Sequence, residues 1–165
     1  MTANNFDFDP NELSQKGLAL LNQGSFKESL VIFVKLNSYF PNNPDLLNLI
    51  GYANLQLEFF DDALSAYTKS IKINPNQVGV FFNKAIVNEK LGNKRQALED
   101  YDNALKLDPE NLDIYQNKSA IFEDLGEFES ALELIDYAIK INPNNYHFYI
   151  NRGNIYEYLS RYDEA

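Results

Sequence analysis

The stretch ALEDYDNALKLDPEN, from Ala97 to Asn111, occurs in three versions in this sequence. A related stretch, ALSAYTKSIKINPNQ (Ala63–Gln77), precedes it, and another, ALELIDYAIKINPNN (Ala131–Asn145), follows it at the same distance. Prolines recur at that same interval: Pro41, Pro75, Pro109 and Pro143. A constant period of this size, about 34 residues, is typical of an array of small units that bury their apolar faces only against their neighbours. The sequence therefore predicts a repeat protein.

Each unit is predicted to contain two helices, because apolar residues recur at helical spacing on both sides of a turn. The first helix starts after the N-cap Asp9, with Pro10 at its first position and Glu12 three residues after the cap, and it ends before Gly24. The other helices are expected near Phe26–Phe40, Asp45–Leu57, Asp61–Ile73, Val80–Leu91, Lys94–Leu107, Leu112–Leu125, Phe128–Ile141 and Tyr146–Leu159. Breaks between paired helices are expected at Gly24, Glu58, Gly92, Gly126 and Ser160.

The chain is expected to form one repeat domain over residues 9–165, after a flexible leader at residues 1–8 that lacks periodicity. The repeats are predicted at residues 10–43, 44–77, 78–111 and 112–145, with a truncated fifth at 146–165. A partner helix would start at Tyr162, and Ala165 takes the place of Ala131 in the copy before it. We therefore expect the natural protein to continue, and the last turn, from Arg161, to be frayed.

Composition restricts the function classes. With 165 residues, 45% hydrophobic and 14% aromatic, the chain can bury the core of one domain. Its net charge is −10 and it has no Lys/Arg cluster, which argues against nucleic acid or an anionic membrane as a partner. The absence of cysteine excludes disulfides and thiolate metal sites. The N-terminus lacks a signal-peptide pattern and no long apolar run occurs, so a soluble, cytoplasmic chain is expected.

Small residues recur where two helices of a unit would cross. Close antiparallel packing needs such residues at the crossing and large ones around it. On the first helices they are Gly17, Gly51, Ala85, Ser119 and Gly153, which follow one another at the repeat period. On the second helices they are Ala63, Ala97 and Ala131, with Phe33, Tyr67, Tyr101 and Ile135 nearby as the large residues.

The fourth unit shows the complete motif in Tyr115, Ser119, Phe122, Gly126, Phe128, Ala131, Ala138 and Pro143. In these residues the chain resembles the tetratricopeptide repeat family, and the resemblance covers residues 10–165. It implies an all-α, right-handed superhelical solenoid of antiparallel helix pairs, whose first helices line a concave groove that binds peptide segments. Departures such as Asn54, Asn88 and Lys94 weaken individual units.

The groove lining follows from the face of the first helices that lies opposite their core residues. The candidate peptide-binding residues are Leu49, Tyr52, Asn83, Ile86, Lys90, Asp113, Asn117, Asp124, Asn151 and Asn154. Within this set Asn83, Asn117 and Asn151 form a column. The column resembles the asparagine ladder in the arms of O-linked N-acetylglucosamine transferases, whose amides bond the backbone of an extended peptide. Asparagine is common in this sequence, so a chance column is an open alternative.

Charge divides the predicted groove into two halves. The C-terminal half carries Glu89, Asp113, Glu123, Asp124 and Glu157, against Lys90 alone. The N-terminal half offers Leu18, Leu49 and Tyr52. A ligand is therefore expected to present apolar side chains toward the first two repeats and Lys or Arg toward the others. The family's carboxylate clamp needs paired lysine, asparagine and arginine, and no three consecutive repeats supply that set.

The sequence contains few candidate catalytic residues. His147 is the single histidine, and no glycine-rich phosphate loop or metal-spaced cluster occurs, so no enzyme activity, cofactor or metal is expected. The leading hypothesis is a protein-interaction module for a neutral or basic protein or peptide. The alternative is the N-terminal substrate-recruiting arm of a larger enzyme, such as a glycosyltransferase. Self-association of the repeats is a third possibility.

Overall fold

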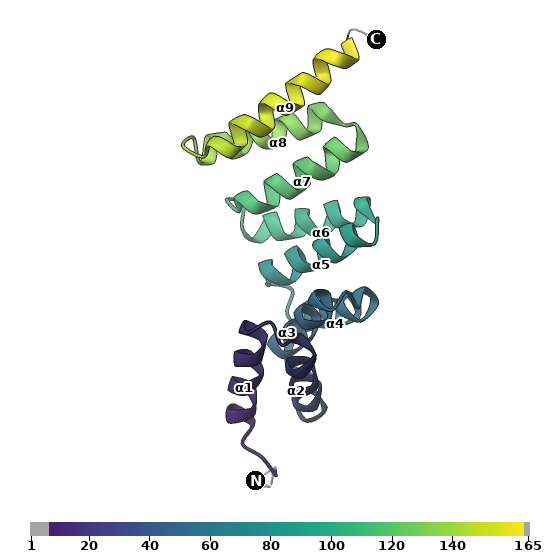
Figure 1. Cartoon of the computed structure of the whole chain (residues 1–165), viewed down its shortest axis with the longest axis vertical. Helices are drawn as coiled ribbons and strands as arrows, with labels where there is room; N and C mark the ends of the chain where they lie inside the picture. Colours follow the sequence, from purple (N-terminus) through teal and green to yellow (C-terminus); the bar gives the residue numbers. More distant parts are fainter. Residues whose placement is uncertain (1–6, 164–165) are drawn as a thin grey trace.

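The computed structural model describes residues 7–163, with side chains as far as Ser160. Within this range the regular elements are α-helices that stack one after another along the long axis of the molecule (Figure 1). They are α1 (Pro10–Asn22), α2 (Phe26–Tyr39), α3 (Pro44–Gln56), α4 (Phe60–Ile73), α5 (Val78–Lys90), α6 (Lys94–Leu107), α7 (Leu112–Leu125), α8 (Phe128–Ile141) and α9 (Tyr146–Asp163). The described residues form an all-α solenoid, so the expected fold class is confirmed.

Local sequence signals explain where the helices begin and turn. The side chain of Asp9 accepts the backbone N–H of Asn11 at 2.8 Å and thereby caps α1. The turns inside the first four helix pairs each contain one residue in the left-handed region: Gly24 (φ 78°), Glu58 (φ 61°), Gly92 (φ 77°) and Gly126 (φ 74°). Glycine adopts this region without steric cost, and Glu58 shows that the turn is imposed even where glycine is missing. These four expected breaks are confirmed.

The break expected at Ser160 is wrong, because α9 runs without interruption from Tyr146 to Asp163. A methyl group added at Gly153 would meet no atom within 4 Å, whereas one added at Gly51 would meet the Tyr67 ring at 2.5 Å. Among the described residues, α9 therefore lacks a partner on the face where earlier first helices pack their second helices. Without that packing, continued helical hydrogen bonding is preferred to a turn. Residues 164–165 of the predicted frayed end lie outside the described residues.

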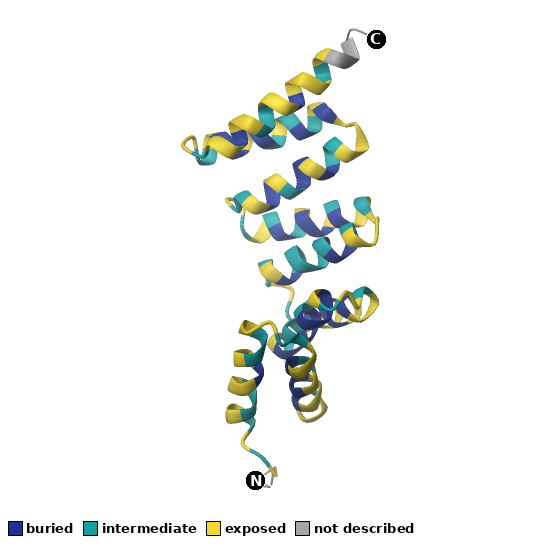
Figure 2. Ribbon diagram, in the orientation of Figure 1, coloured by how far each residue is buried: buried dark blue, intermediate teal, exposed yellow. Residues whose placement is uncertain are grey.

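The core lies between paired and successive helices, where buried residues face one another (Figure 2). Phe33, Tyr67 and Tyr101, at equivalent positions of three second helices, are 0% exposed. Each such side chain contributes roughly 1.5–3 kcal/mol by burial. A methyl group added at Gly17 would lie 2.7 Å from the Phe33 ring, so the small residue permits this close approach. The predicted core face is confirmed at these positions.

The chain before α1 folds back onto α2. The ring of Phe8 meets the ring of Tyr39 edge-on, with 5.2 Å between centroids, and Lys35 Nζ lies 4.4 Å from the Phe8 centroid. Residues 1–6 of the predicted leader lie outside the described residues.

Candidate functional site

One side of α3 carries Leu49, Tyr52 and Gln56, at spacings that place side chains on the same face of a helix. Leu49 lines a cavity of about 260 Å³ beside α1 and α3. Tyr52 and Gln56 line a second cavity, of about 290 Å³, between α3 and α5. Both cavities are thus lined by residues of α3. We call this face of α3, with the same repeat positions on α5, α7 and α9, the groove.

The second of these, the α3–α5 cavity, brings together four of the residues that the sequence places in the groove: Tyr52, Asn83, Ile86 and Lys90. Its remaining lining residues are Leu55, Gln56, Glu58 and Phe60. Among the other candidates Leu49 lines the first cavity, whereas neither cavity is lined by Asp113, Asn117, Asp124, Asn151 or Asn154. The structure therefore gathers the N-terminal candidates closely and leaves the others along the later helices.

The asparagine column is half-buried at all three positions, and at Asn117 the amide already has an internal partner. Asn117 Nδ2 donates to the hydroxyl of Tyr101, which stands 16 residues earlier on α6, at 3.0 Å. Tyr67 precedes Asn83 by the same interval, and Ile135, which has no hydroxyl, precedes Asn151. The sequence predicts these tyrosines as core residues but not their contact with the column, which their constant distance before Asn83 and Asn117 could have indicated.

Two tyrosine hydroxyls behind the column differ in their hydrogen bonds. The Tyr101 hydroxyl donates to the carboxylate of Glu89, and burial, followed by Glu89, raises the tyrosine pKa. The hydroxyl of Tyr67 is also buried but has no hydrogen-bond partner among the described residues. Burial first, then Tyr52, raises the pKa of Tyr67, while Asn83 lowers it, so both groove residues lie close to this hydroxyl. Asn83 approaches the hydroxyl without completing a hydrogen bond.

The acidic part of the groove is less negative than the sequence indicates. Asp124 Oδ2 lies 3.1 Å from Lys94 Nζ, at the start of α6, so Lys90 is not the single basic residue near the groove. Glu89 and Glu123 are half-buried, and burial is the largest effect that raises the pKa of each carboxyl. Asp113 and Asn154 are exposed. The acidic character of the groove therefore rests mainly on the other four acids that the sequence places there, Glu89, Asp113, Glu123 and Glu157.

Ion pairs join successive repeats at a neighbouring position. Lys118 on α7 pairs with Asp102 on α6, and Arg152 Nη1 on α9 lies 3.0 Å from Asp136 Oδ1 on α8. Both pairs join residues 16 apart. The third basic residue of this column is Lys84, and the residue at the same distance before it is Thr68, which carries no charge.

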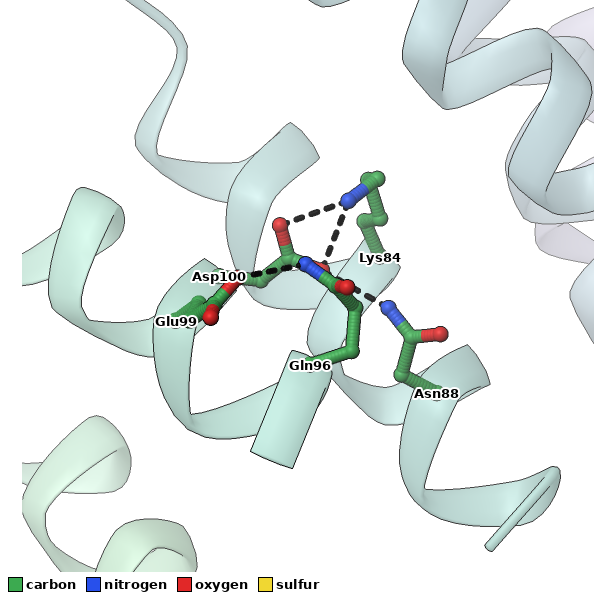
Figure 3. Close-up of polar contacts among 5 residues, drawn as sticks. All are labelled: Lys84, Asn88, Gln96, Glu99 and Asp100. Carbon is green, nitrogen blue, oxygen red and sulfur yellow. Dashed lines mark hydrogen bonds and ion pairs between the residues drawn. The ribbon is translucent and has the colours of Figure 1, made fainter. Parts of the chain in front are cut away.

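Lys84 instead turns into its own repeat (Figure 3). Its Nζ lies 2.6 and 2.7 Å from the two carboxylate oxygens of Asp100, whose side chain is 4% exposed. Asn88 Nδ2 donates to the same carboxylate at 2.8 Å, and Gln96 donates to Glu99 nearby. A cavity of about 790 Å³ lies beside this cluster, lined by Leu64, Thr68, Lys84, Asn88, Gly92, Asn93, Lys94, Arg95, Gln96 and Leu125.

The part of the chain that the structure describes offers no sign of metal chemistry. There, no group of three His, Cys, Asp or Glu side chains is placed to hold a metal ion. None of the helices in residues 7–163 is long and apolar enough to cross a membrane.

Models of the tetratricopeptide repeat match residues 44–77, 79–111, 112–145 and 134–165. The chain belongs to the tetratricopeptide repeat family. No curated protein matches it in sequence. Repeat-protein scaffolds of this kind bind other proteins, which agrees with a site built from cavities along helices.

Solved structures share the fold of this tetratricopeptide repeat protein. A crystal structure of MamA superposes with a TM-score of 0.84, at 21% identity over 94% of this chain and 85% of MamA. YrrB, described as a TPR protein with an unusual peptide-binding site, gives 0.77 at 22% identity over 87% of this chain and 74% of YrrB. TTC0263, a TPR protein of Thermus thermophilus, gives 0.72 at 18% identity, over 89% of this chain and 81% of TTC0263. At these identities the likeness concerns the fold.

Proposed function

We propose that the groove binds an extended or helical segment of a partner protein, and that this segment is neutral to basic. The observation that carries the proposal is the α3–α5 cavity, which joins Tyr52 to Asn83, Ile86 and Lys90 across two successive first helices. Apolar walls with a few polar groups at the edge are the usual composition of a ligand site. The peptide-binding site named for YrrB is a precedent within the fold.

Backbone recognition in this proposal falls to Asn83, Asn117 and Asn151. A side-chain amide offers two N–H donors and one acceptor, so it can pair with a peptide group of any sequence. Asn117 uses one N–H for Tyr101, which leaves its second N–H and its Oδ1 for a ligand. Each net hydrogen bond contributes about 0.5–1.5 kcal/mol, so the column supplies a moderate part of the affinity.

Charge recognition falls to Glu89, Glu123 and Asp113. The pair between Asp124 and Lys94 removes one acidic group from the attraction. Ion pairs that solvent reaches contribute about 0–1 kcal/mol each, so these acids mainly speed the encounter and disfavour acidic partners. The side of the ligand that faces α5 and α7 should therefore carry Lys or Arg.

Fluorescence anisotropy with short labelled peptides tests this function. Basic peptides should bind more tightly than acidic peptides of the same length and apolar content. Added salt should weaken the binding of the basic peptides. Asn→Ala at positions 83, 117 and 151 together should cost about 2–4 kcal/mol of binding. Asn103→Ala, on α6 and outside the column, is the matched control. Light scattering at the same concentrations separates ligand binding from self-association.

Unchanged binding by the triple variant would show that the column does not hold the ligand. Preferential binding of acidic peptides would contradict the proposed charge recognition. Because Asn117 also serves Tyr101, the free energy of unfolding of the triple variant has to be measured beside its affinity.

A further inference from the structure

The α3–α5 cavity has apolar walls and a polar rim. Leu55 is buried, and Tyr52, Phe60 and Ile86 are half-buried around it. The rim holds Gln56, Glu58 and Lys90, which are exposed, and Asn83, which is half-buried. With a volume of about 290 Å³, the cavity has room for one side chain and excludes a longer piece of chain.

The equivalent position one repeat later is built differently. Leu55 and Glu89 stand at the same position of successive repeats, as do Tyr67 and Tyr101. At the later position the Glu89 carboxylate accepts from the Tyr101 hydroxyl, so both polar groups are paired. At the earlier position Leu55 offers no acceptor, and the buried Tyr67 hydroxyl has no partner among the described residues. Leu55 belongs to the core cluster that contains Ala63, Tyr67, Val80 and Val87, so the apolar wall of the cavity is continuous with the core and leaves the Tyr67 hydroxyl without an acceptor.

We propose that the α3–α5 cavity is an anchor subsite for one leucine-sized aliphatic side chain of the bound segment. This inference rests on the proposed function. The peptide group beside that residue would present its carbonyl oxygen to the donors Asn83 Nδ2 and Lys90 Nζ at the rim. The next residues toward α7 would be basic, because Glu89 and Glu123 lie in that direction. The ligand is thus an aliphatic residue adjacent to Lys or Arg.

Leu55 sets this preference in the proposal. A glutamate at position 55 would give the Tyr67 hydroxyl the acceptor that Glu89 gives Tyr101, and it would place a carboxylate against the anchor. Leucine at this position therefore leaves the Tyr67 hydroxyl without a hydrogen bond and gives the α3–α5 cavity an apolar wall. Glu89 occupies the same repeat position as Leu55, so its hydrogen bond with Tyr101 shows the contact that a glutamate at position 55 is expected to make with Tyr67.

The experiment uses the full chain and labelled peptides of a Gly/Ser background with two arginines and one variable residue. Peptides with leucine, alanine or glutamate at the variable position are compared, with the arginines on either side. The peptide with leucine should bind at least about tenfold more tightly than the peptide with alanine, because the additional carbons of leucine are transferred from water into the cavity. Methyl NMR signals of Leu55 and Ile86 should shift with the leucine peptide and remain in place with the alanine peptide.

Leu55→Glu is the test variant on the protein side. It should remove the leucine preference. The Tyr67 hydroxyl gains an acceptor, but Leu55 packs in the core with Ala63, Val80 and Val87, so the melting temperature should fall and is measured beside the affinity. Asn76→Glu adds the same charge at an exposed position that lines neither groove cavity, and it should keep the leucine preference. The comparison separates loss of the apolar wall from a general effect of charge.

Each outcome decides between the two proposals. If arginine peptides bind equally with leucine and alanine, the subsite is wrong and the groove function stands. If no peptide binds, both are overturned. If leucine is preferred but the shifts fall on methyl groups far from Leu55 and Ile86, the anchor lies elsewhere and this assignment fails.

Discussion

The junction between α6 and α7 and the junction between α4 and α5 use the same repeat positions with different side chains. At α6–α7 the Tyr101 hydroxyl donates to Glu89 and accepts from Asn117, and Asp102 pairs with Lys118. The contacts of Asn117 and Lys118 tie the second helix of one repeat to the first helix of the next, whereas the contact with Glu89 lies within one repeat. Each polar group of this set has a partner.

At α4–α5 the equivalent groups are unpaired or diverted. The Tyr67 hydroxyl has no partner among the described residues, Thr68 stands in the place of Asp102, and Lys84 turns to Asp100 in its own repeat. One cavity opens at the groove and another beside Lys84. The two junctions thus differ in the side chains at equivalent repeat positions, with polar pairs at α6–α7 and unpaired or diverted groups at α4–α5. The α3–α5 cavity is where we place the ligand.

The diverted ion pair should give the largest effect. Asp100 is 3% exposed, and Asp100→Ala leaves Lys84 and Asn88 without the carboxylate that they share. Removing one member of a buried pair costs about 3–5 kcal/mol. Asp136→Ala is the matched control, because the side chains of Arg152 and Asp136 are 33% and 40% exposed, and its loss should cost about 0–1 kcal/mol. Urea unfolding measures both, and equal losses would show that the Lys84 cluster is not a distinct feature of α5–α6.

The two tyrosine hydroxyls give the next effect. Tyr101→Phe should lower the free energy of unfolding by about 1–3 kcal/mol, because Glu89 and Asn117 both lose a partner. Tyr67→Phe should leave stability unchanged or raise it, because it removes a buried donor for which the described residues offer no acceptor. Thermal unfolding followed by circular dichroism compares the two. A larger loss for Tyr67→Phe would mean that its hydroxyl has a partner in solution and that the two junctions are alike.

Much of the fold can be predicted from the sequence, because the constant repeat period fixes which residues are equivalent. The repeat position of Glu58 predicts a turn although the residue is not glycine, and its positive φ confirms this. Ser160 occupies the same position, yet α9 continues through it, since position in the repeat forms a turn only where a second helix packs. The repeat period predicts which residues are equivalent. Tertiary contacts decide whether these residues form the same turn.

The candidate site is less predictable for a related reason. Helical periodicity places Tyr52 and Ile86 on the groove side, and both residues line the α3–α5 cavity. It does not show that Asn117 is shared with Tyr101, or that Lys94 reaches Asp124, because these contacts cross between repeats. Pairing across a junction depends on both side chains, and a single sequence offers no direct signal for it. The peptide-binding role of the predicted residues stays a prediction.

Restoring the missing charge at α4–α5 should have a smaller effect on stability. Thr68→Asp places a carboxylate as far before Lys84 as Asp102 stands before Lys118. The new pair should contribute about 0–1 kcal/mol, because Lys84 already serves Asp100. Thr68→Asn, of similar size and without charge, is the control. A loss of stability with aspartate but not with asparagine would show that Asp100 repels the added charge and that Lys84 cannot serve both.

The smallest effect is the pH dependence of basic-peptide binding, and its sign follows from Glu89 and Glu123. Burial, the largest cause, raises the pKa of both carboxyls, and Asp124 raises each pKa further. The hydrogen bond from Tyr101 and the charge of Lys90 lower the pKa of Glu89, but the raised direction prevails. Only the ionised carboxylates attract Lys or Arg. Affinity should be full above the raised pKa values and should fall as the pH decreases through them.

This fall should begin at a higher pH than for an exposed glutamate, whose pKa is about 4.3. It is distinguishable from acid unfolding. An acid with a pKa raised by folding binds more protons in the folded state, so its contribution to stability increases, rather than decreases, as the pH falls through that range. Glu89→Gln with Glu123→Gln should remove most of the dependence, and a leucine peptide without arginine should not show it. If the arginine peptide keeps its affinity below that pH range, its basic residues do not lie against α5 and α7. The proposed charge recognition by Glu89 and Glu123 would then be wrong.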